Sequence, residues 1–209
     1  EIASCLVGSE MCIRDRLSCS AYAVNQTGMG MEDTVVISGL GAIGMGMLQF
    51  ALLRNPKRVI GIDTNDALCE IAEKLGAAEV LNPMKEDVTK RIMELTDGVG
   101  CDIYMEATGN PASVETGMNC LRKQGMLFIY SVFKKKAEID LNQISEFKEL
   151  RVIGGHLSPG AFPYTIDCLE KGKINAKVMV TDIFGLNEID EAMSAKKPDR
   201  VSIKTVLVP

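Results

Sequence analysis

The chain has 209 residues, of which 46% are hydrophobic and 24% are charged, values that are typical of a globular protein and exclude a disordered or fibrous class. The formal net charge of −5 argues against a general nucleic-acid-binding protein, because such proteins need a basic face. The sequence has no run of about 18 apolar residues, so we predict no membrane span.

The first 16 residues, EIASCLVGSEMCIRDR, do not share the pattern of the rest of the chain. The stretch LVGSEMCIRDR looks like a translated sequencing adapter, so residues 1–16 are interpreted as a non-native artefact. The alternative is a genuine but atypical terminal helix. With either interpretation, we expect the chain to begin inside a larger protein.

Helix and strand patterns alternate from Leu17 onward. Residues 17–29 predict a helix with small side chains on one face that ends near Gly28. Residues 34–38, TVVIS, form a continuous apolar and β-branched run, which is typical of a strand buried on both faces of a parallel sheet. Further strands are predicted at 58–63, 78–81, 101–107, 126–132 and 150–155, and helices at 45–54, 67–76, 87–96 and 111–123.

This alternation predicts an α/β fold, a Rossmann-type doubly wound parallel sheet, over residues 17–156. Residues 157–209 follow a different pattern, and we expect them to leave the Rossmann domain and return to a second domain whose main part is absent from the chain. In that segment we predict helices at 162–172 and 187–195, and strands at 178–184 and 201–208.

The most informative motif is Gly39-Leu40-Gly41-Ala42-Ile43-Gly44, which follows a predicted strand and opens a predicted helix. Gly39 permits a tight turn, Gly41 lets the backbone approach a pyrophosphate, and Gly44 lets the helix pack closely on the sheet. The helix N-terminus then offers free N–H groups to phosphates.

An acidic residue, Asp63, ends the next predicted strand. A carboxylate there accepts hydrogen bonds from ribose hydroxyls and repels a 2′-phosphate, which predicts NAD rather than NADP as the cofactor. The alternative is a plain glycine turn with a solvent-facing Asp. The predicted cofactor contacts of this region are Gly39, Gly41, Ala42, Ile43, Gly44, Asp63 and Thr64.

Ligands of such sheets bind outside the carboxyl ends of the strands, where the strand order reverses. The residues that follow the strands at 101–107 and 126–132 are therefore further candidates for cofactor contact, the second group on the nicotinamide side. Ordinary loop geometry is the alternative for both groups. These candidates are Ala107, Thr108, Gly109, Tyr130, Ser131 and Val132.

Seven cysteines are scattered along the chain without a Cys-x-x-Cys pair, which predicts reduced thiols of a cytoplasmic protein. The single histidine, His156, has no second ligand at metal-binding spacing, so we predict no metal site in this chain. Cys19 is interpreted as a packing residue and His156 as a satisfied or exposed side chain. We assign no catalytic residue.

The order of motifs resembles the zinc-dependent alcohol dehydrogenases among the medium-chain dehydrogenases/reductases. The resemblance covers residues 17–209 and is closest to polyol (sorbitol) and threonine dehydrogenases. It implies NAD-dependent oxidation of a small alcohol or polyol, with no nucleic acid or membrane as partner. The motifs are LSCSAYAV, DTVVISGLGAIG, VIGID, AEKLGAAEVLNP, TDGVGCDIYMEATGNP, FKELRVIGGHLSP and DIFGLNEIDEAM followed by VSIKTVLV.

The same resemblance implies that a GroES-like catalytic domain precedes residue 17 and carries the zinc ligands, while 157–209 contributes to that domain. Zinc is therefore expected only in the full-length enzyme, and the present fragment is expected to be inactive alone. The family commonly dimerises through an edge strand, and residues 135–141, KKAEIDL, have the alternation for such an edge. We thus expect a homodimer or homotetramer.

Two other functions stay open. One is a zinc-independent, quinone-reductase-like enzyme, which usually prefers NADPH, so Asp63 argues against it. The other is a non-catalytic NAD-sensing Rossmann module. The resemblance is incomplete at one point, because the basic residue that the family places shortly after the ribose-binding acid is missing, and Asp66, Ala67 and Leu68 stand there.

Overall fold

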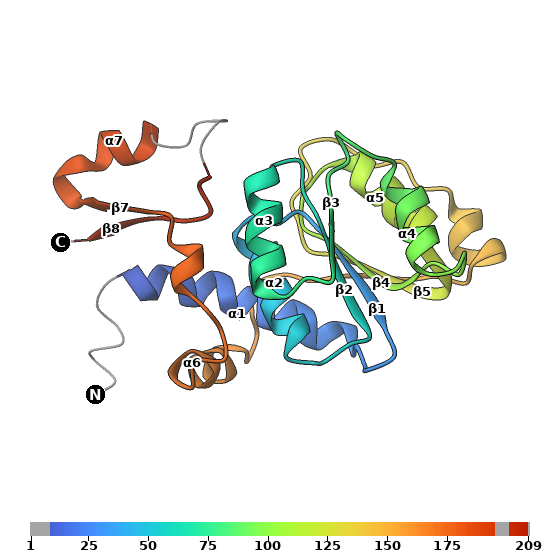
Figure 1. The fold of residues 1–209 in the computed structure, drawn as a ribbon, viewed down its shortest axis with the longest axis horizontal. Helices are drawn as coiled ribbons and strands as arrows, with labels where there is room; N and C mark the ends of the chain where they lie inside the picture. Colours follow the sequence, from blue (N-terminus) through green and yellow to red (C-terminus); the bar gives the residue numbers. More distant parts are fainter. Residues whose placement is uncertain (1–8, 195–200, 209) are drawn as a thin grey trace.

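The computed structural model describes residues 9–194 and 201–208, and its largest part is a parallel sheet with helices on both faces (Figure 1). The strands pair in the order β3-β2-β1-β4-β5-β6, all of them parallel. This is the order of a doubly wound dinucleotide-binding sheet, so the predicted Rossmann fold is confirmed. The strands are β1 (Thr34–Ser38), β2 (Arg58–Ile62), β3 (Glu79–Leu81), β4 (Cys101–Glu106), β5 (Leu121–Ile129) and β6 (Arg151–Gly154).

Helices cover both faces of this sheet. On one face lie α2 and α3, with α1 packed on α2 and α6 packed on α1, whereas α4 and α5 cover the other face (Figure 1). The helices are α1 (Ser9–Thr27), α2 (Ala42–Leu52), α3 (Asp66–Leu75), α4 (Val88–Leu95), α5 (Pro111–Cys120) and α6 (Phe162–Glu170).

The side chains of the central strands alternate between two hydrophobic cores. In β1, Val35 and Ile37 belong to one core and Val36 belongs to the other, and every residue of the strand is buried. Successive strand residues point to opposite faces, so a strand covered by helices on both sides is apolar throughout. The continuous run that predicted a doubly buried strand is explained by this packing.

Side-chain caps fix where several helices begin. Asn65, Asp87 and Asn110 precede α3, α4 and α5, and each accepts a hydrogen bond from a backbone N–H of the first turn. These bonds satisfy donors that a helix N-terminus otherwise leaves free. At the other end of α3, Gly76 adopts the left-handed conformation with φ 110°, which favours glycine.

Small residues let α1 and α2 approach closely. The buried Ser20 hydroxyl on α1 donates to the carbonyl oxygen of Ile43 at 2.8 Å. A Cβ atom at Gly46 would lie only 2.4 Å from that hydroxyl oxygen. The predicted helix with a small-residue face is confirmed. It begins earlier than predicted, inside the segment 1–16, whose non-native origin stays a prediction.

Two local predictions are wrong. The helix predicted to continue through 121–123 ends at Cys120, because Leu121 is buried and the Arg122 guanidinium pairs with Asp102 of β4 at 2.5 Å, which draws these residues into β5. The segment 135–141 lies outside any strand of the described chain, since β6 takes the place beside β5 and forms the edge.

The segment after α6 forms a small unit at the end of the molecule where α1 begins (Figure 1). Its strand predictions are confirmed only in part, because residues before β7 turn into a short 3-10 helix that buries Met179. Residue 195, at the end of the predicted helix, lies outside the described residues. The unit comprises η2 (Lys177–Met179), β7 (Asp182–Gly185), η3 (Leu186–Glu188), α7 (Ile189–Ser194) and β8 (Thr205–Val208), with β7 and β8 parallel.

A further π-helical turn, η1 (Gln143–Phe147), precedes β6. None of the helices in the described part of the chain has the length and apolarity that crossing a membrane requires.

Candidate functional site

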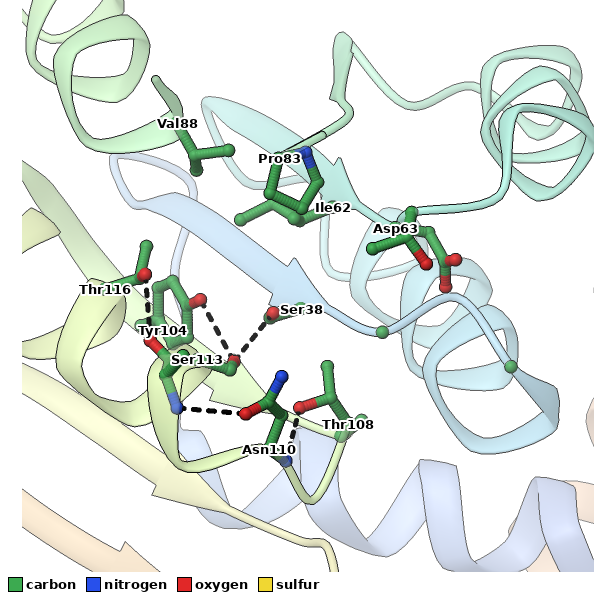
Figure 2. Close-up of a pocket in the computed structure, with 15 residues that line it drawn as sticks. Ser38, Ile62, Asp63, Pro83, Val88, Tyr104, Thr108, Asn110, Ser113 and Thr116 are labelled. Atoms are coloured by element: carbon green, nitrogen blue, oxygen red, sulfur yellow. Dashed lines mark hydrogen bonds between the residues drawn. The ribbon is translucent and has the colours of Figure 1, made fainter. Parts of the chain in front are cut away.

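A cleft of about 460 Å³ lies at the carboxyl ends of the central strands (Figure 2). Its walls come from the turn after β1, the ends of β2 and β4, and the first residues of α4 and α5. Among the predicted cofactor contacts, Gly39, Gly41, Asp63, Thr64, Ala107 and Thr108 line this cleft. The sequence prediction missed the other lining residues, Ser38, Ile62, Pro83, Val88, Tyr104, Asn110, Ala112, Ser113 and Thr116.

The three glycines of the turn face different surroundings. Gly39 has φ 93° and is packed so closely that a Cβ atom would lie 3.0 Å from the carbonyl of Ala107. At Gly44 a Cβ atom would lie 1.6 Å from the Gly39 carbonyl oxygen, which no side chain tolerates. Around Gly41, by contrast, a Cβ atom would meet no described atom within 4 Å beyond its own neighbours in the chain. Gly39 and Gly44 are therefore required by packing, and Gly41 leaves space free at the cleft.

The free space at Gly41 coincides with the N-terminus of α2. Gly41 is the N-cap of this helix and has no side chain to accept a hydrogen bond, so the N–H groups of the first turn keep their binding capacity. The other predicted contacts on α2, Ala42, Ile43 and Gly44, belong to that turn. A helix N-terminus with free N–H groups attracts anions such as phosphate.

Asp63 lies beside the glycine turn (Figure 2). Its two carboxylate oxygens accept hydrogen bonds from the backbone N–H groups of Leu40, at 2.7 Å, and Asn65, at 2.9 Å. These bonds fix the side chain between the turn and the start of α3. A carboxylate oxygen can accept two hydrogen bonds, and each oxygen of Asp63 accepts only one of these backbone bonds. Because the residue is only half-buried, Asp63 retains acceptor capacity towards the cleft.

A second acid, Asp66, is the first residue of α3. The ammonium of Lys85 lies 2.7 Å from this carboxylate, and the Asn82 side chain donates to it at 2.8 Å. The hydrogen bond from Lys85, followed by the one from Asn82, lowers the pKa of Asp66. Asp66 is therefore ionised at neutral pH, and Lys85 is a cation that the sequence prediction missed.

Neutral hydroxyl groups form another wall of the cleft. Ser113 donates to the Ser38 hydroxyl at 2.8 Å and lies 3.3 Å from the Tyr104 hydroxyl (Figure 2). Burial raises the pKa of Tyr104, so its phenol remains protonated at neutral pH. This wall offers hydrogen bonds rather than charge. No spacing in the sequence marks these hydroxyls, although the Asn110-Pro111 helix start locates Ser113 in the first turn of α5.

The remaining predicted contacts lie on the loops after β4 and β5, outside the cleft. Gly109 and Ser131 take part in a hydrogen-bond network around Glu106, whereas Val132 is 91% exposed. The Tyr130 ring stacks on Phe128 with 6.0 Å between ring centroids, and its hydroxyl donates to the carbonyl of Leu157. We call the surface at the carboxyl ends of the strands the strand-end surface. The glycine turn and Asp63 form its first half, and the loops after β4 and β5 form its second half.

Metal-binding side chains do not gather in the described part of the chain, where no group of three His, Cys, Asp or Glu residues is placed to hold an ion. Cys19 is buried on α1, in agreement with a packing role, and His156 is exposed. The described residues therefore do not fit a zinc site.

The comparisons with known proteins point to dehydrogenases. The family model described as zinc-binding dehydrogenase matches residues 42–171. The chain is 38% identical over 193 residues to an erythritol/L-threitol dehydrogenase of Mycolicibacterium smegmatis, covering 92% of this chain and 53% of that protein. It is 33% identical over 176 residues to an L-threonine 3-dehydrogenase of Pyrococcus abyssi, covering 80% and 50%.

A solved structure extends the comparison to the cofactor. The crystal structure of a putative zinc-binding dehydrogenase from Sinorhizobium meliloti 1021, bound to NADP, superimposes with a TM-score of 0.87 and 26% identity, covering 94% of this chain and 58% of that one. The chain spans about half the length of the curated relatives that it matches. The family match, the strand order and the glycine turn show that the chain belongs to the zinc-binding dehydrogenase family.

Proposed function

We propose that the chain is the cofactor-binding half of an NAD-dependent dehydrogenase that oxidises a small alcohol or polyol. The observation that carries this proposal is the free space at Gly41, which lies at the N-terminus of α2 with the Asp63 carboxylate beside it. The names of the relatives, erythritol/L-threitol dehydrogenase and L-threonine 3-dehydrogenase, support a small hydroxyl-bearing substrate.

In this proposal the cleft and the loops beside it each bind one part of the cofactor. The N–H groups of the first turn of α2 bind the pyrophosphate, which approaches closely because Gly41 has no Cβ. Asp63 accepts hydrogen bonds from the adenosine ribose hydroxyls. The loops that begin at Ala107 and Tyr130 orient the nicotinamide, which when bound takes up the hydride of the alcohol.

The preference for NAD over NADP rests on charge. Asp63 lines the cleft where the proposal puts the adenosine ribose, and its carboxylate repels a 2′-phosphate. Lys85 and Asp66 form an ion pair at 2.7 Å, so their charges largely cancel towards a ligand. Since a relative of known structure binds NADP, this preference is a property to measure for this chain.

The domain arrangement is part of the proposal. We assign residues 17–156 to the NAD-binding domain and 157–209 to the return into a GroES-like catalytic domain that carries the zinc. The unit around β7 and β8 supports this assignment, because Ile183, Leu186 and Met193 expose 61%, 59% and 80% of their surface and would be covered by such a domain. The 209-residue chain alone should therefore lack dehydrogenase activity.

We further propose that the enzyme forms a homodimer or homotetramer in the cytoplasm. The edge strand that supports dimerisation is β6, where Val152 and Ile153 are 38% and 36% exposed, rather than the segment 135–141. A reducing compartment agrees with the free thiols of Cys19, Cys69, Cys101, Cys120 and Cys168. Sedimentation at several protein concentrations tests the assembly, and a monomer of the full-length protein at all of them would refute it.

The first experiment titrates the purified chain with NADH and NADPH and follows nicotinamide fluorescence. We expect tighter binding of NADH, with the preference lost in Asp63→Ser. Asp63→Asn removes the charge with a smaller change of shape, and Asp167→Asn, an exposed carboxylate on α6, is the matched control that should keep the preference. Folded wild-type protein, checked by circular dichroism, that binds neither cofactor would refute the proposal.

A second measurement distinguishes the dehydrogenase from a non-catalytic NAD-sensing module. The same chain is joined to its upstream half, and alcohol-dependent NAD reduction is followed with and without a chelator. Zinc-dependent turnover supports the dehydrogenase, whereas cofactor binding without turnover of any alcohol or polyol supports the sensor. Turnover by the 209-residue chain alone would overturn the division of roles between the halves.

A further inference from the structure

A buried acid lies between the two loops that form the second half of the strand-end surface. Glu106 is the last residue of β4 and is 0% exposed. Its Oε1 atom accepts hydrogen bonds from the backbone N–H groups of Thr108, at 2.8 Å, and Gly109, at 3.0 Å. The Thr108 hydroxyl donates to the same oxygen at 2.5 Å. The loop after β4 is thus wrapped around one carboxylate oxygen.

The other oxygen of this carboxylate binds the next loop. The Ser131 hydroxyl, after β5, donates to Oε2 of Glu106. The two loops also touch directly, because a Cβ atom at Gly109 would lie 2.6 Å from the carbonyl oxygen of Val132. One side chain therefore sets the position of both loops relative to each other.

The same loop touches the glycine turn on its other side. A Cβ atom at Gly39 would lie 2.9 Å from the Thr108 methyl group and 3.0 Å from the Ala107 carbonyl. The turn, the loop after β4 and the loop after β5 are consequently packed in series along the strand ends. Displacing the middle loop changes the surface that follows the phosphate-binding turn.

We propose that Glu106 is a positioning residue for the nicotinamide half of the cofactor. It does not reach a ligand itself, because it is buried and four donors occupy its carboxylate. It acts through Thr108, Gly109 and Ser131, whose places it fixes. This inference rests on the proposed cofactor binding and adds a residue that the motif-based prediction of the site did not include.

The role predicts a difference between two ligands. ADP carries the diphosphate and the adenosine ribose, which in the proposed site are bound by the glycine turn and Asp63. NADH additionally needs the loops after β4 and β5. Loss of the Glu106 contacts should therefore weaken NADH more than ADP, whereas general damage to the fold weakens both alike.

Three variants test this prediction. Ser131→Ala removes the hydrogen bond from the loop after β5 to Glu106 and should weaken NADH by about tenfold, the value of one charge-assisted hydrogen bond, with ADP changed less than about twofold. Glu106→Ala should weaken NADH by at least about tenfold. Glu106→Gln should bind nearly like wild type, because its carbonyl oxygen accepts from Thr108 and Gly109 and its amide donates to Ser131.

Binding of ADP is measured by calorimetry and binding of NADH by nicotinamide fluorescence, whose emission also reports the surroundings of the ring. Ser145→Ala, an exposed hydroxyl beyond β5, is the matched control and should change neither. A purely structural role of Glu106 predicts parallel losses of ADP and NADH, and that result would overturn the proposal. Weak NADH binding by Glu106→Gln would show that these hydrogen bonds do not position the loops, and would overturn it as well.

The outcomes stay interpretable when one variant fails. If circular dichroism shows that Glu106→Ala is unfolded, Ser131→Ala and Glu106→Gln still decide the question. If wild type binds NADH and Ser131→Ala binds it equally well, the positioning role is wrong and the proposed function stands. If folded wild type binds neither ADP nor NADH, the proposed function is wrong, and the positioning role falls with it.

Discussion

Replacing Gly44 by alanine tests whether the glycine turn is held by packing. The new Cβ atom would lie 1.6 Å from the Gly39 carbonyl oxygen and 2.8 Å from its carbonyl carbon. Gly39 cannot move away easily, because its N–H donates to the carbonyl oxygen of Ile62 at 2.8 Å and its other side is packed on Ala107. Either the turn or the start of α2 must therefore shift.

The size of the effect follows from two opposing contributions. Overpacking costs about 1–3 kcal/mol, and a clash between backbone atoms belongs at the upper end of this range. Alanine in place of glycine within a helix stabilises the folded state by about 1 kcal/mol. We expect the free energy of unfolding of Gly44→Ala to fall by about 2 kcal/mol, measured by urea unfolding followed by far-UV circular dichroism. For a chain of this size the melting temperature should fall by about 4–8 °C.

The neighbouring glycine provides the contrast. Gly41→Ala places its Cβ in space that no described atom occupies within 4 Å, so stability should fall by less than about 1 kcal/mol, the cost of losing a glycine N-cap. NADH affinity should nevertheless fall by at least about tenfold, because the methyl group stands where the pyrophosphate approaches. Unfolding of Gly44→Ala within about 0.5 kcal/mol of wild type, or equal destabilisation by both changes, would refute this reasoning.

Three further predictions concern stability, with urea unfolding as the measurement. Gly46→Ala should cost about 1–3 kcal/mol because its Cβ would lie 2.4 Å from the Ser20 hydroxyl oxygen, and adding Ser20→Gly should recover part of the loss; no recovery would contradict the assigned contact. Lys148→Met should cost about 1–2 kcal/mol, since its ammonium donates to three carbonyl oxygens at and just after the end of α5, whereas the exposed Lys123→Met should cost almost nothing. Burial raises the pKa of Tyr104, so its contribution is complete below the unfolded value of about 10 and is lost as the pH rises through the folded value; wild type should therefore lose stability above about pH 10 more steeply than Tyr104→Phe, and equal slopes would contradict this.

The parts of the fold that local chemistry determines were predictable from the sequence. The doubly buried run of β1 requires helices on both faces, and the glycine turn requires a strand before it and a helix after it. Predictions that depend on competition between neighbours were wrong. Residues 135–141 have the alternation of an edge strand, but β6 occupies the place beside β5. Arg122 lies in a helical pattern, but its ion pair with Asp102 belongs to the sheet.

The candidate site was predictable to a similar extent. The turn at Gly41 and the acid Asp63 have a fixed order along the chain, so spacing identifies them. The hydroxyl wall of Ser38, Tyr104 and Ser113 joins two strands and a helix, and no spacing connects these residues. Lys85 was missed for the same reason, because it lies close to Asp66 only in the folded sheet, where β3 forms the edge.

Two acids at strand ends show why composition and position along a strand do not define a role. Asp63 follows β2, is half-buried, and uses its two oxygens for one backbone bond each, which leaves acceptor capacity for a ligand. Glu106 ends β4, is fully buried, and receives four donors from two loops, so its capacity is taken up by the protein. The first arrangement suits recognition and the second suits positioning. In the proposed site each half of the dinucleotide thus has its own acid, and the two acids differ in the number of donors that the folded loops bring to the carboxylate.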